Sequence, residues 1–145
     1  MLDNSGSTTV LLRQMAFGGI SGRPDISIVV PVYGSEGCLQ SLASAIVEAL
    51  GPTGRPYEVI LVNDCSPDGS WAVIERICDS HPNFIGVDLR RNFGQDNALI
   101  TGLRLASGRY VAIMDDDLQH HPRDLPALVE EIEKGFDVVF ADFRT

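Results

Sequence analysis

The chain has 145 residues, of which 44% are hydrophobic and 21% charged, and its formal net charge at pH 7 is -9. This length and composition indicate one globular domain with a buried core and exclude a disordered chain. The negative charge argues against a nonspecific nucleic-acid binder, which needs a basic face, and an anionic ligand would need a cation, helix N-termini or a few local arginines.

The first predicted element is a strand that follows a leader. Residues 1–24 contain Ser, Thr, Gly and Asn without sustained periodicity, so we expect a flexible leader with at most a short helix around residues 10–17. Residues 26–32, ISIVVPV, form a run rich in β-branched side chains, which is typical of a parallel strand buried on both faces. Apolar residues then recur at helical spacing from Leu39 to Leu50, and the following Gly-Pro pair ends that helix.

Strands and helices keep alternating along the rest of the chain. The apolar patterns predict further strands at residues 57–63, 84–89, 110–114 and 137–141. Helices are predicted between them, at about residues 71–81, 95–106 and 122–135. This alternation predicts an α/β fold in residues 25–145, with an open, mainly parallel sheet and helices on both faces.

The cysteines and the apolar runs bear on the cellular location. Cys38, Cys65 and Cys78 are odd in number and too scattered for a zinc site, so reduced thiols of a cytoplasmic protein fit better. No apolar run approaches the roughly 20 residues that span a bilayer, and the N-terminus does not have the pattern of a signal peptide. We therefore expect a cytoplasmic location, which leaves room for work at a membrane surface.

Four polar clusters follow four of the predicted strands. They read YGSEG, NDCSPDGS, RRNFGQDN and DDDLQHH, in chain order. In open α/β sheets, ligands bind outside the carboxyl ends of the strands, so four clusters on that edge predict a ligand site. The first cluster is not the G-x-G-x-x-G fingerprint of dinucleotide-binding proteins, and G-x-x-x-x-G-K-[ST] occurs nowhere in the chain.

The first three clusters each offer a candidate ligand side chain beside an ordinary structural interpretation. Tyr33 either stacks on a base or sugar or is a rim tyrosine beside a Gly-rich turn. Asp64 ends its strand, where a carboxylate can accept an N–H from a planar base, and the residues after it form a turn. Arg90 and Arg91 are the only adjacent basic pair, and one of them can hold a phosphate while Asn92 caps the next helix.

The fourth cluster contains three successive carboxylates, whose mutual repulsion calls for a cation or for water. If the chain stays extended past Met114, Asp115 and Asp117 lie on one side, together with Gln119 if the extension reaches it, and Asp116 points the other way. Two carboxylates and an amide oxygen are hard ligands that suit Mg²⁺ or Mn²⁺. The cluster therefore predicts a divalent-metal site.

Other interpretations of the fourth cluster fit less well. His120 and His121 suggest zinc, but adjacent histidines point apart and Pro122 follows, so a role at the start of the helix is favoured. A retaining-glycosidase pair lacks an identifiable acid partner. A phosphate-accepting receiver domain needs a lysine at a late strand end, and Lys134 falls inside a predicted helix.

Taken together, these motifs resemble the inverting, GT-A type glycosyltransferases of family 2, and most of all their polyprenyl-phosphate (dolichyl-phosphate mannose synthase-like) branch. The stretches VVPVYGSEG, ILVNDCSPDGSW, RNFGQDNALITGLRLASG and VAIMDDDLQHHPRDLP have the order and spacing of that family over about residues 25–141. The resemblance implies a Rossmann-like GT-A fold that is truncated here. The acceptor side and any membrane helices would lie beyond residue 145.

The resemblance also assigns roles to individual residues. Substrate-binding residues would be Pro31, Tyr33, Val62, Asp64, Asp115 and Asp116, to which we add Arg91 as a phosphate contact. Asp115, Asp117 and Gln119 would bind the metal ion, and Asp115 and Asp117 would be catalytic through it. The family often has Asn-Glu or Glu-Glu directly after the tyrosine, whereas here Gly34 and Ser35 precede Glu36. Arg144 lies one residue out of register with a family arginine.

The implied activity is metal-dependent, inverting transfer of a sugar from a nucleoside-diphosphate sugar to a polyprenyl phosphate at the cytoplasmic face of a membrane. A phosphate monoester with a second pKa near ~6 is largely ionised at pH 7, so the acceptor needs no general base. The alternative is a non-catalytic fragment that binds nucleotide sugars but lacks the acceptor side.

Overall fold

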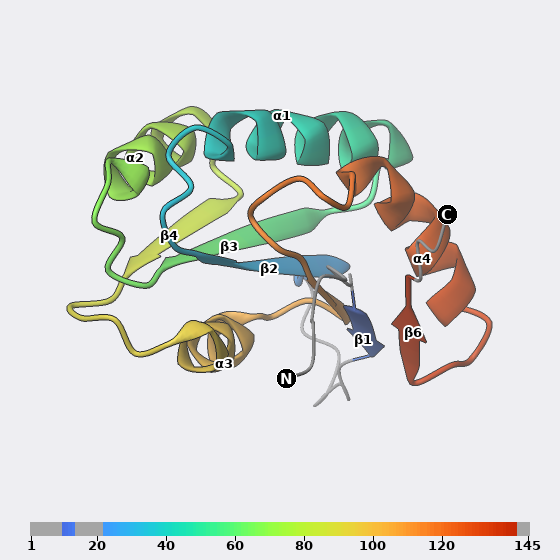
Figure 1. The fold of residues 1–145 in the computed structure, drawn as a ribbon. Coiled ribbons are helices and arrows are strands. Elements are labelled where there is room, and N and C mark those ends of the chain that lie inside the picture. Colours follow the sequence, from blue (N-terminus) through green and yellow to red (C-terminus); the bar gives the residue numbers. More distant parts are fainter. Residues whose placement is uncertain (1–9, 14–21, 142–145) are drawn as a thin grey trace.

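The structure is a computed structural model that describes residues 10–13 and 22–141. Its centre is a six-stranded sheet with the strand order β4-β3-β2-β5-β1-β6 (Figure 1). Four neighbouring strands are parallel, as predicted: β2 (Ile26–Val32), β3 (Tyr57–Asn63), β4 (Phe84–Asp88) and β5 (Tyr110–Ile113). β1 (Val10–Arg13) runs antiparallel to both β5 and β6 (Val138–Phe140).

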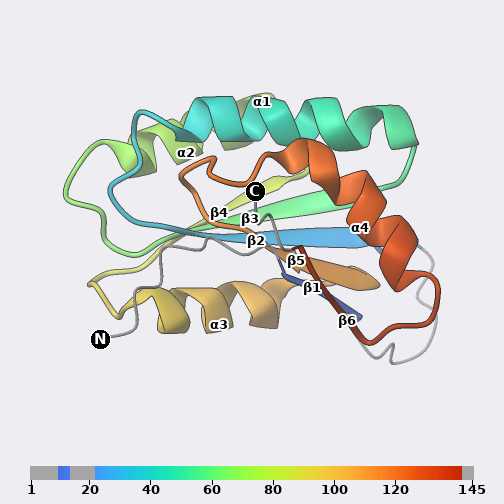
Figure 2. The ribbon, with the colours of Figure 1, turned by 45° about the vertical axis from the view of Figure 1, so that its right-hand side comes forward.

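Helices cover both faces of the sheet, which confirms the predicted architecture. Figure 2 shows α1 (Leu39–Leu50), α2 (Ser70–Ser80) and α4 (Leu125–Ile132) on one face and α3 (Gln95–Leu105) on the other. Two short 3₁₀ helices precede or follow them, η1 (Gly51–Thr53) and η2 (Pro122–Asp124). The helix predicted to begin at Pro122 therefore starts with a 3₁₀ turn before α4.

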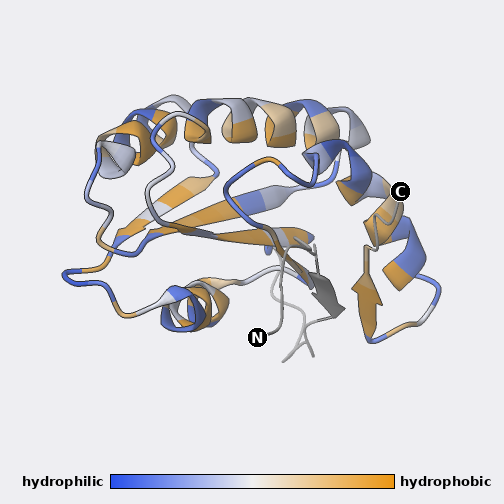
Figure 3. Cartoon of the chain, in the orientation of Figure 1, coloured by the Kyte–Doolittle hydropathy of each residue, from blue (hydrophilic) through white to orange (hydrophobic). Residues whose placement is uncertain are grey.

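β2 and β3, the two strands at the centre of the parallel part of the sheet, form the core because their side chains alternate between the two helical layers. Ile28 and Val30 of β2 pack in the cluster shared with α1, α2 and α4, while Val29 faces α3, and all three are fully buried. In Figure 3 these central strands are largely hydrophobic, whereas the helices carry hydrophilic residues on their outer sides. On the α3 face, Gly102 lets the helix approach closely, since an added Cβ would clash with Val29.

β1 corrects one expectation from the sequence. The predicted short helix around residues 10–17 is wrong over residues 10–13, which form a strand, and residues 14–17 lie outside the described part of the chain. The physical reason is pairing: β5 and β6 each present unpaired backbone groups, and a strand inserted between them satisfies both edges. The predicted boundary at residue 24 stays a prediction.

The sheet opens between β2 and β5 at their carboxyl ends. β2 pairs with β3 over its full length but with β5 only as far as Val29, whose carbonyl accepts the N–H of Met114 at 3.1 Å. Alternate residues of a strand direct their N–H groups to the same side, so Pro31, which has no N–H, faces the side that β5 has left. The proline therefore limits pairing there, and a gap forms beyond it.

Candidate active site

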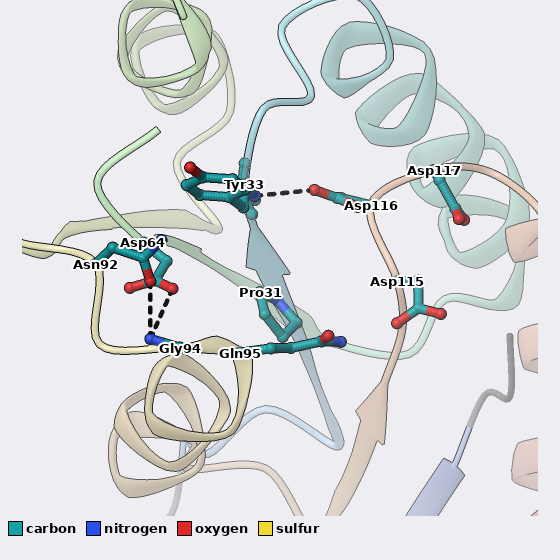
Figure 4. A pocket seen from close by; sticks show the side chains of 10 residues that line it. Pro31, Tyr33, Asp64, Asn92, Gly94, Gln95, Asp115, Asp116 and Asp117 are labelled. Carbon is teal, nitrogen blue, oxygen red and sulfur yellow. Dashed lines mark hydrogen bonds between the residues drawn. The ribbon is translucent and has the colours of Figure 1, made fainter. Parts of the chain in front are cut away.

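A cavity of about 480 Å³ lies at this opening, at the carboxyl ends of β2, β3 and β5 (Figure 4). The strand order reverses here, because the chain runs from β2 outward to β4 and then places β5 on the other side of β2. Such a switch point is where open α/β sheets bind ligands. The end of β2 and the loops after all four parallel strands line it: Pro31, Val32, Tyr33, Asp64, Asn92, Gly94, Gln95, Asp115, Asp116 and Asp117.

Residues 115–119, in the loop after β5, form the aspartate loop. β5 ends at Ile113, so the chain does not stay extended through the aspartates. Leu118 has a φ of 60°, in the left-handed region that side chains with a Cβ rarely adopt. The extended backbone assumed in the sequence analysis is therefore wrong here, and a turn determines where each aspartate points.

The three aspartates fall into two groups. Oδ2 of Asp116 accepts the backbone N–H of Tyr33 at 3.1 Å and also the hydroxyl of Ser35. Figure 4 shows the Asp116 carboxylate directed at Tyr33, whereas the carboxylates of Asp115 and Asp117 point away from Tyr33. Burial raises the pKa of Asp116, and the hydrogen bonds from Ser35 and Tyr33 oppose that rise.

Asp64 holds the loop between β4 and α3. Its side chain is buried, and its two carboxylate oxygens accept the N–H of Phe93 at 2.8 Å and the N–H of Gly94 at 3.0 Å. Gly94 has a φ of 92°, a conformation that favours glycine, and directs the chain into α3. Because of these bonds, Asn92, Gly94 and Gln95 form one wall of the cavity.

The turn after β2 is fixed to the start of α2. The N–H of Ser35 donates to the hydroxyl oxygen of Ser70 at 3.0 Å, and the N–H of Gly69 donates to the carboxylate of Glu36 at 3.0 Å. Ser35 and Glu36 lie in the stretch after Tyr33 where the chain departs from the family pattern. In the structure they join neighbouring loops.

Some predicted site residues do not line the cavity. Val62 is fully buried in the core beneath α3. Arg91 is exposed, with its guanidinium carbon 5.8 Å from the ring centroid of Phe93. Gln119 is exposed in the aspartate loop, and its backbone N–H donates to Asp117 at 3.1 Å. Pro31, Tyr33, Asp64 and the three aspartates line one cavity. Val62, Arg91 and Gln119 are not among the residues that line it.

The histidines and the last arginine have separate outcomes. His121 precedes η2 and its Nδ1 accepts the N–H of Arg123 at 3.1 Å, which confirms its role at the start of the helix. Arg144 lies outside the described residues. Val32, Gly94 and Gln95 also line the cavity but were not among the predicted site residues, although RRNFGQDN marked the loop that supplies the last two.

The donor groups fit a divalent ion held jointly by protein and ligand. Within residues 22–141, no group of three or more His, Cys, Asp or Glu side chains could hold a metal by itself. The cavity instead offers the carboxylates of Asp115 and Asp117. Mg²⁺ and Mn²⁺ take such hard oxygen ligands and fill their remaining positions with water and phosphate oxygens, whereas structural zinc sites require a full protein ligand set.

Comparison with known proteins gives a family match. The family model described as Glycosyl transferase family 2 matches residues 27–145. Similar curated proteins are undecaprenyl-phosphate 4-deoxy-4-formamido-L-arabinose transferases, from Shewanella sediminis at 39% identity over 117 residues and from Pseudomonas fluorescens at 41% over 117 residues. Each match covers 79% of this chain, but only 35% and 34% of the relative, so the chain spans about a third of their length.

Solved structures of similar fold are glycosyltransferases. Mannosyltransferase PcManGT from Pyrobaculum calidifontis, in complex with GDP-Man and Mn²⁺, is 29% identical with a TM-score of 0.60, covering 74% of this chain and 31% of that chain. TarS 1–349 of S. aureus in complex with UDP-GlcNAc is 25% identical with a TM-score of 0.58, covering 74% and 31%. The fold is therefore of the GT-A type. Among the described helices, none has the length and apolar character needed to cross a bilayer.

Proposed function

Because the chain belongs to glycosyl transferase family 2, we propose that it is the donor-binding part of an inverting, metal-dependent enzyme that transfers a sugar from a nucleoside-diphosphate sugar to a polyprenyl phosphate. One observation carries the proposal: the cavity at the switch point has an aromatic and a carboxylate wall, from Tyr33 and Asp64, facing the carboxylates of Asp115 and Asp117. A nucleotide needs the first wall for its base and a cation on the second for its diphosphate.

The two walls have different tasks. Tyr33 is 54% exposed at the cavity and offers a ring face to a base or ribose, beside Pro31. Asp64 is fixed by two backbone N–H groups, and its remaining lone pairs can accept an N–H from the base. Asp115 and Asp117 would hold Mg²⁺ or Mn²⁺ against the diphosphate. When bound, the ion supplies Lewis-acid stabilisation to the leaving nucleoside diphosphate.

The acceptor chemistry follows from its charge. A polyprenyl phosphate is largely ionised at pH 7, since the second pKa of a phosphate monoester is about 6. One of its oxygens forms the new bond to the anomeric carbon while the bond from that carbon to the diphosphate breaks and its electron pair leaves with the nucleotide. Displacement from the opposite face inverts the anomeric centre, and no base of the chain has to remove a proton.

The names of the relatives support the acceptor class and those of the solved structures support the donor class. The relatives are transferases acting on undecaprenyl phosphate, and PcManGT was solved with GDP-Man and Mn²⁺. A membrane-held acceptor places the working protein at a membrane surface, and a nucleotide-sugar donor places it on the cytoplasmic face.

Titration calorimetry with UDP-sugars and GDP-sugars, with and without Mn²⁺ or Mg²⁺, tests the proposal. We expect donor binding that requires the divalent ion and that Asp117→Asn weakens at least about tenfold, because the variant loses a charged ligand. Asp137→Asn, at an exposed position before β6, is the matched control and should bind as wild type. Equal affinity of Asp117→Asn and wild type would contradict the metal site, and donor binding without transfer to polyprenyl phosphate would favour the non-catalytic alternative.

A further inference from the structure

Asp116, the middle aspartate of the run, makes two hydrogen bonds to residues far away in the sequence. Asp116 lies 83 residues from Tyr33 and 81 from Ser35 in the sequence, and its Oδ2 atom accepts hydrogen bonds from both. These bonds join the aspartate loop to the turn after β2. The resemblance to known transferases implied instead that Asp116 contacts the nucleotide sugar.

The location of these bonds gives them a specific consequence. The backbone pairing between β2 and β5 ends with the bond from Met114 to Val29, just before the aspartates. Beyond that point the two strands separate to form the cavity, and Asp116 supplies two side-chain hydrogen bonds across the gap. The distance between the aspartate loop and the turn after β2 therefore depends on the Asp116 carboxylate.

The partner side of the link is itself anchored. The N–H of Ser35 donates to the hydroxyl oxygen of Ser70 at 3.0 Å, and Ser70 is fully buried at the first position of α2. The hydroxyl of Ser70 donates in turn to Asp68 at 2.6 Å. The aspartate loop is thus connected through Asp116 and Ser35 to a helix of the core.

We infer that Asp116 is a positioning residue, which holds the aspartate loop against the turn of Tyr33 and Ser35 so that Asp115 and Asp117 face the donor diphosphate. The inference rests on the proposed function of the cavity and adds a residue to it. Asp116 works as a hydrogen-bond acceptor, so its carbonyl-type oxygen matters and its charge does not. Asp115 and Asp117 act on the ion through their charge.

The substitution of each aspartate by asparagine separates these roles. Asn keeps one carbonyl oxygen, which can replace Oδ2 of Asp116 and accept both hydrogen bonds. Asp116→Asn should therefore retain most of the affinity for UDP or GDP with Mn²⁺, within about threefold of wild type. Asp116→Ala and Ser35→Ala should each weaken it about tenfold, which is the size expected for losing one or two hydrogen bonds. Asp117→Asn should lose more, and Ser44→Ala, on the exposed side of α1, is the matched control.

The double variant Ser35→Ala/Asp116→Ala checks that one link is involved. Residues that form a single interaction give non-additive effects, so the double variant should bind no more weakly than Asp116→Ala. If Asp116→Asn lost as much affinity as Asp117→Asn, Asp116 would be a ligand through its charge and the inference would be wrong. Wild-type affinity of both Asp116→Ala and Ser35→Ala would also overturn it, and Ser35→Ala keeps this test open if Asp116→Ala fails to fold.

Amide hydrogen exchange of Tyr33 separates this inference from the proposed function. Without any ligand, Asp116→Ala should speed exchange at the Tyr33 N–H about tenfold, while Asp116→Asn should leave it close to wild type. If wild type bound neither nucleotide with Mn²⁺, the proposed function would fail while the exchange data still reported on the link. If the Tyr33 amide exchanged equally in all three proteins, the link itself would be refuted.

Discussion

Asp64→Ala should release the loop between β4 and α3 while leaving the sheet intact. In the wild type, the buried Asp64 carboxylate accepts the N–H groups of Phe93 and Gly94 at 2.8 and 3.0 Å. Alanine removes both acceptors. The Gly94 N–H keeps a second acceptor after the substitution, because it also donates to Oδ1 of Asn92 at 3.0 Å. We therefore expect the Phe93 amide to lose more protection than the Gly94 amide.

The magnitude follows from the number and type of bonds. A hydrogen bond to a charged acceptor contributes about 1.5–3 kcal/mol, which corresponds to about 10- to 100-fold faster exchange for the Phe93 amide. Because the loop is exposed, water can replace part of the lost bonding. The free energy of global unfolding should consequently fall by only about 2 kcal/mol, less than the sum of two such bonds.

Hydrogen exchange followed by NMR, under conditions where the rate reports the opening equilibrium, measures the local effect. Urea denaturation measures the global effect. Asp79→Ala, at an exposed position near the end of α2, is the matched control and should change the free energy of unfolding by less than about 0.5 kcal/mol. Wild-type exchange at Phe93 in Asp64→Ala would refute the reasoning, and so would acceleration spread evenly over the whole chain.

Two further predictions concern the packing of α3 and the end of α4. Gly102→Ala should lower the free energy of unfolding by about 1–2 kcal/mol, because an added Cβ would lie under 3.0 Å from Val29, which puts the overpacking cost in the upper part of the range of about 1–3 kcal/mol, and the helix propensity of alanine returns about 1; an unchanged urea midpoint would contradict this. Arg55→Gln removes ion pairs of 2.6 Å to Asp25 and Glu133 and should cost about 0.5–1 kcal/mol at neutral pH. Arg55 lowers the pKa of Glu133 below its ordinary 4.5, so this difference should be present above that pH and shrink as the pH falls further; a difference that persists at about pH 2 would count against the pairing.

The sequence predicts the parallel strands well because their local pattern and their tertiary role agree. Residues 26–32 and 57–63 are largely apolar runs followed by polar clusters, and β2 and β3 have those bounds in the structure. β1 shows the opposite case. Four residues carry too little periodicity to identify a strand, and Val10–Arg13 becomes one only because β5 and β6 lie on either side of it.

For the cavity, the sequence predicts which loops meet but not which side chains face inward. Parallel strands bring their carboxyl ends to one edge, so the four clusters had to lie close together. The direction of each side chain depends on turns that have no simple periodicity. Gln119 follows Leu118 with its positive φ and is exposed, and Arg91 lies beside Phe93. A pattern of alternation cannot anticipate these directions once the strand has ended.

The charges around the cavity give a physical reason why donor binding in the proposed function should require a cation. Four carboxylates border it, and two of them, Asp64 and Asp116, already accept hydrogen bonds from the N–H groups and the hydroxyl of neighbouring loops. Those donors partly offset the charge of these two. Asp115 and Asp117 add further negative charge on the side where a diphosphate would lie. Like charges that lie close together repel strongly in a partly desolvated site. In the proposed function, a nucleoside diphosphate therefore needs a divalent ion between it and Asp115 and Asp117, so chelation of the ion by EDTA should abolish donor binding while leaving the thermal unfolding of the free chain unchanged.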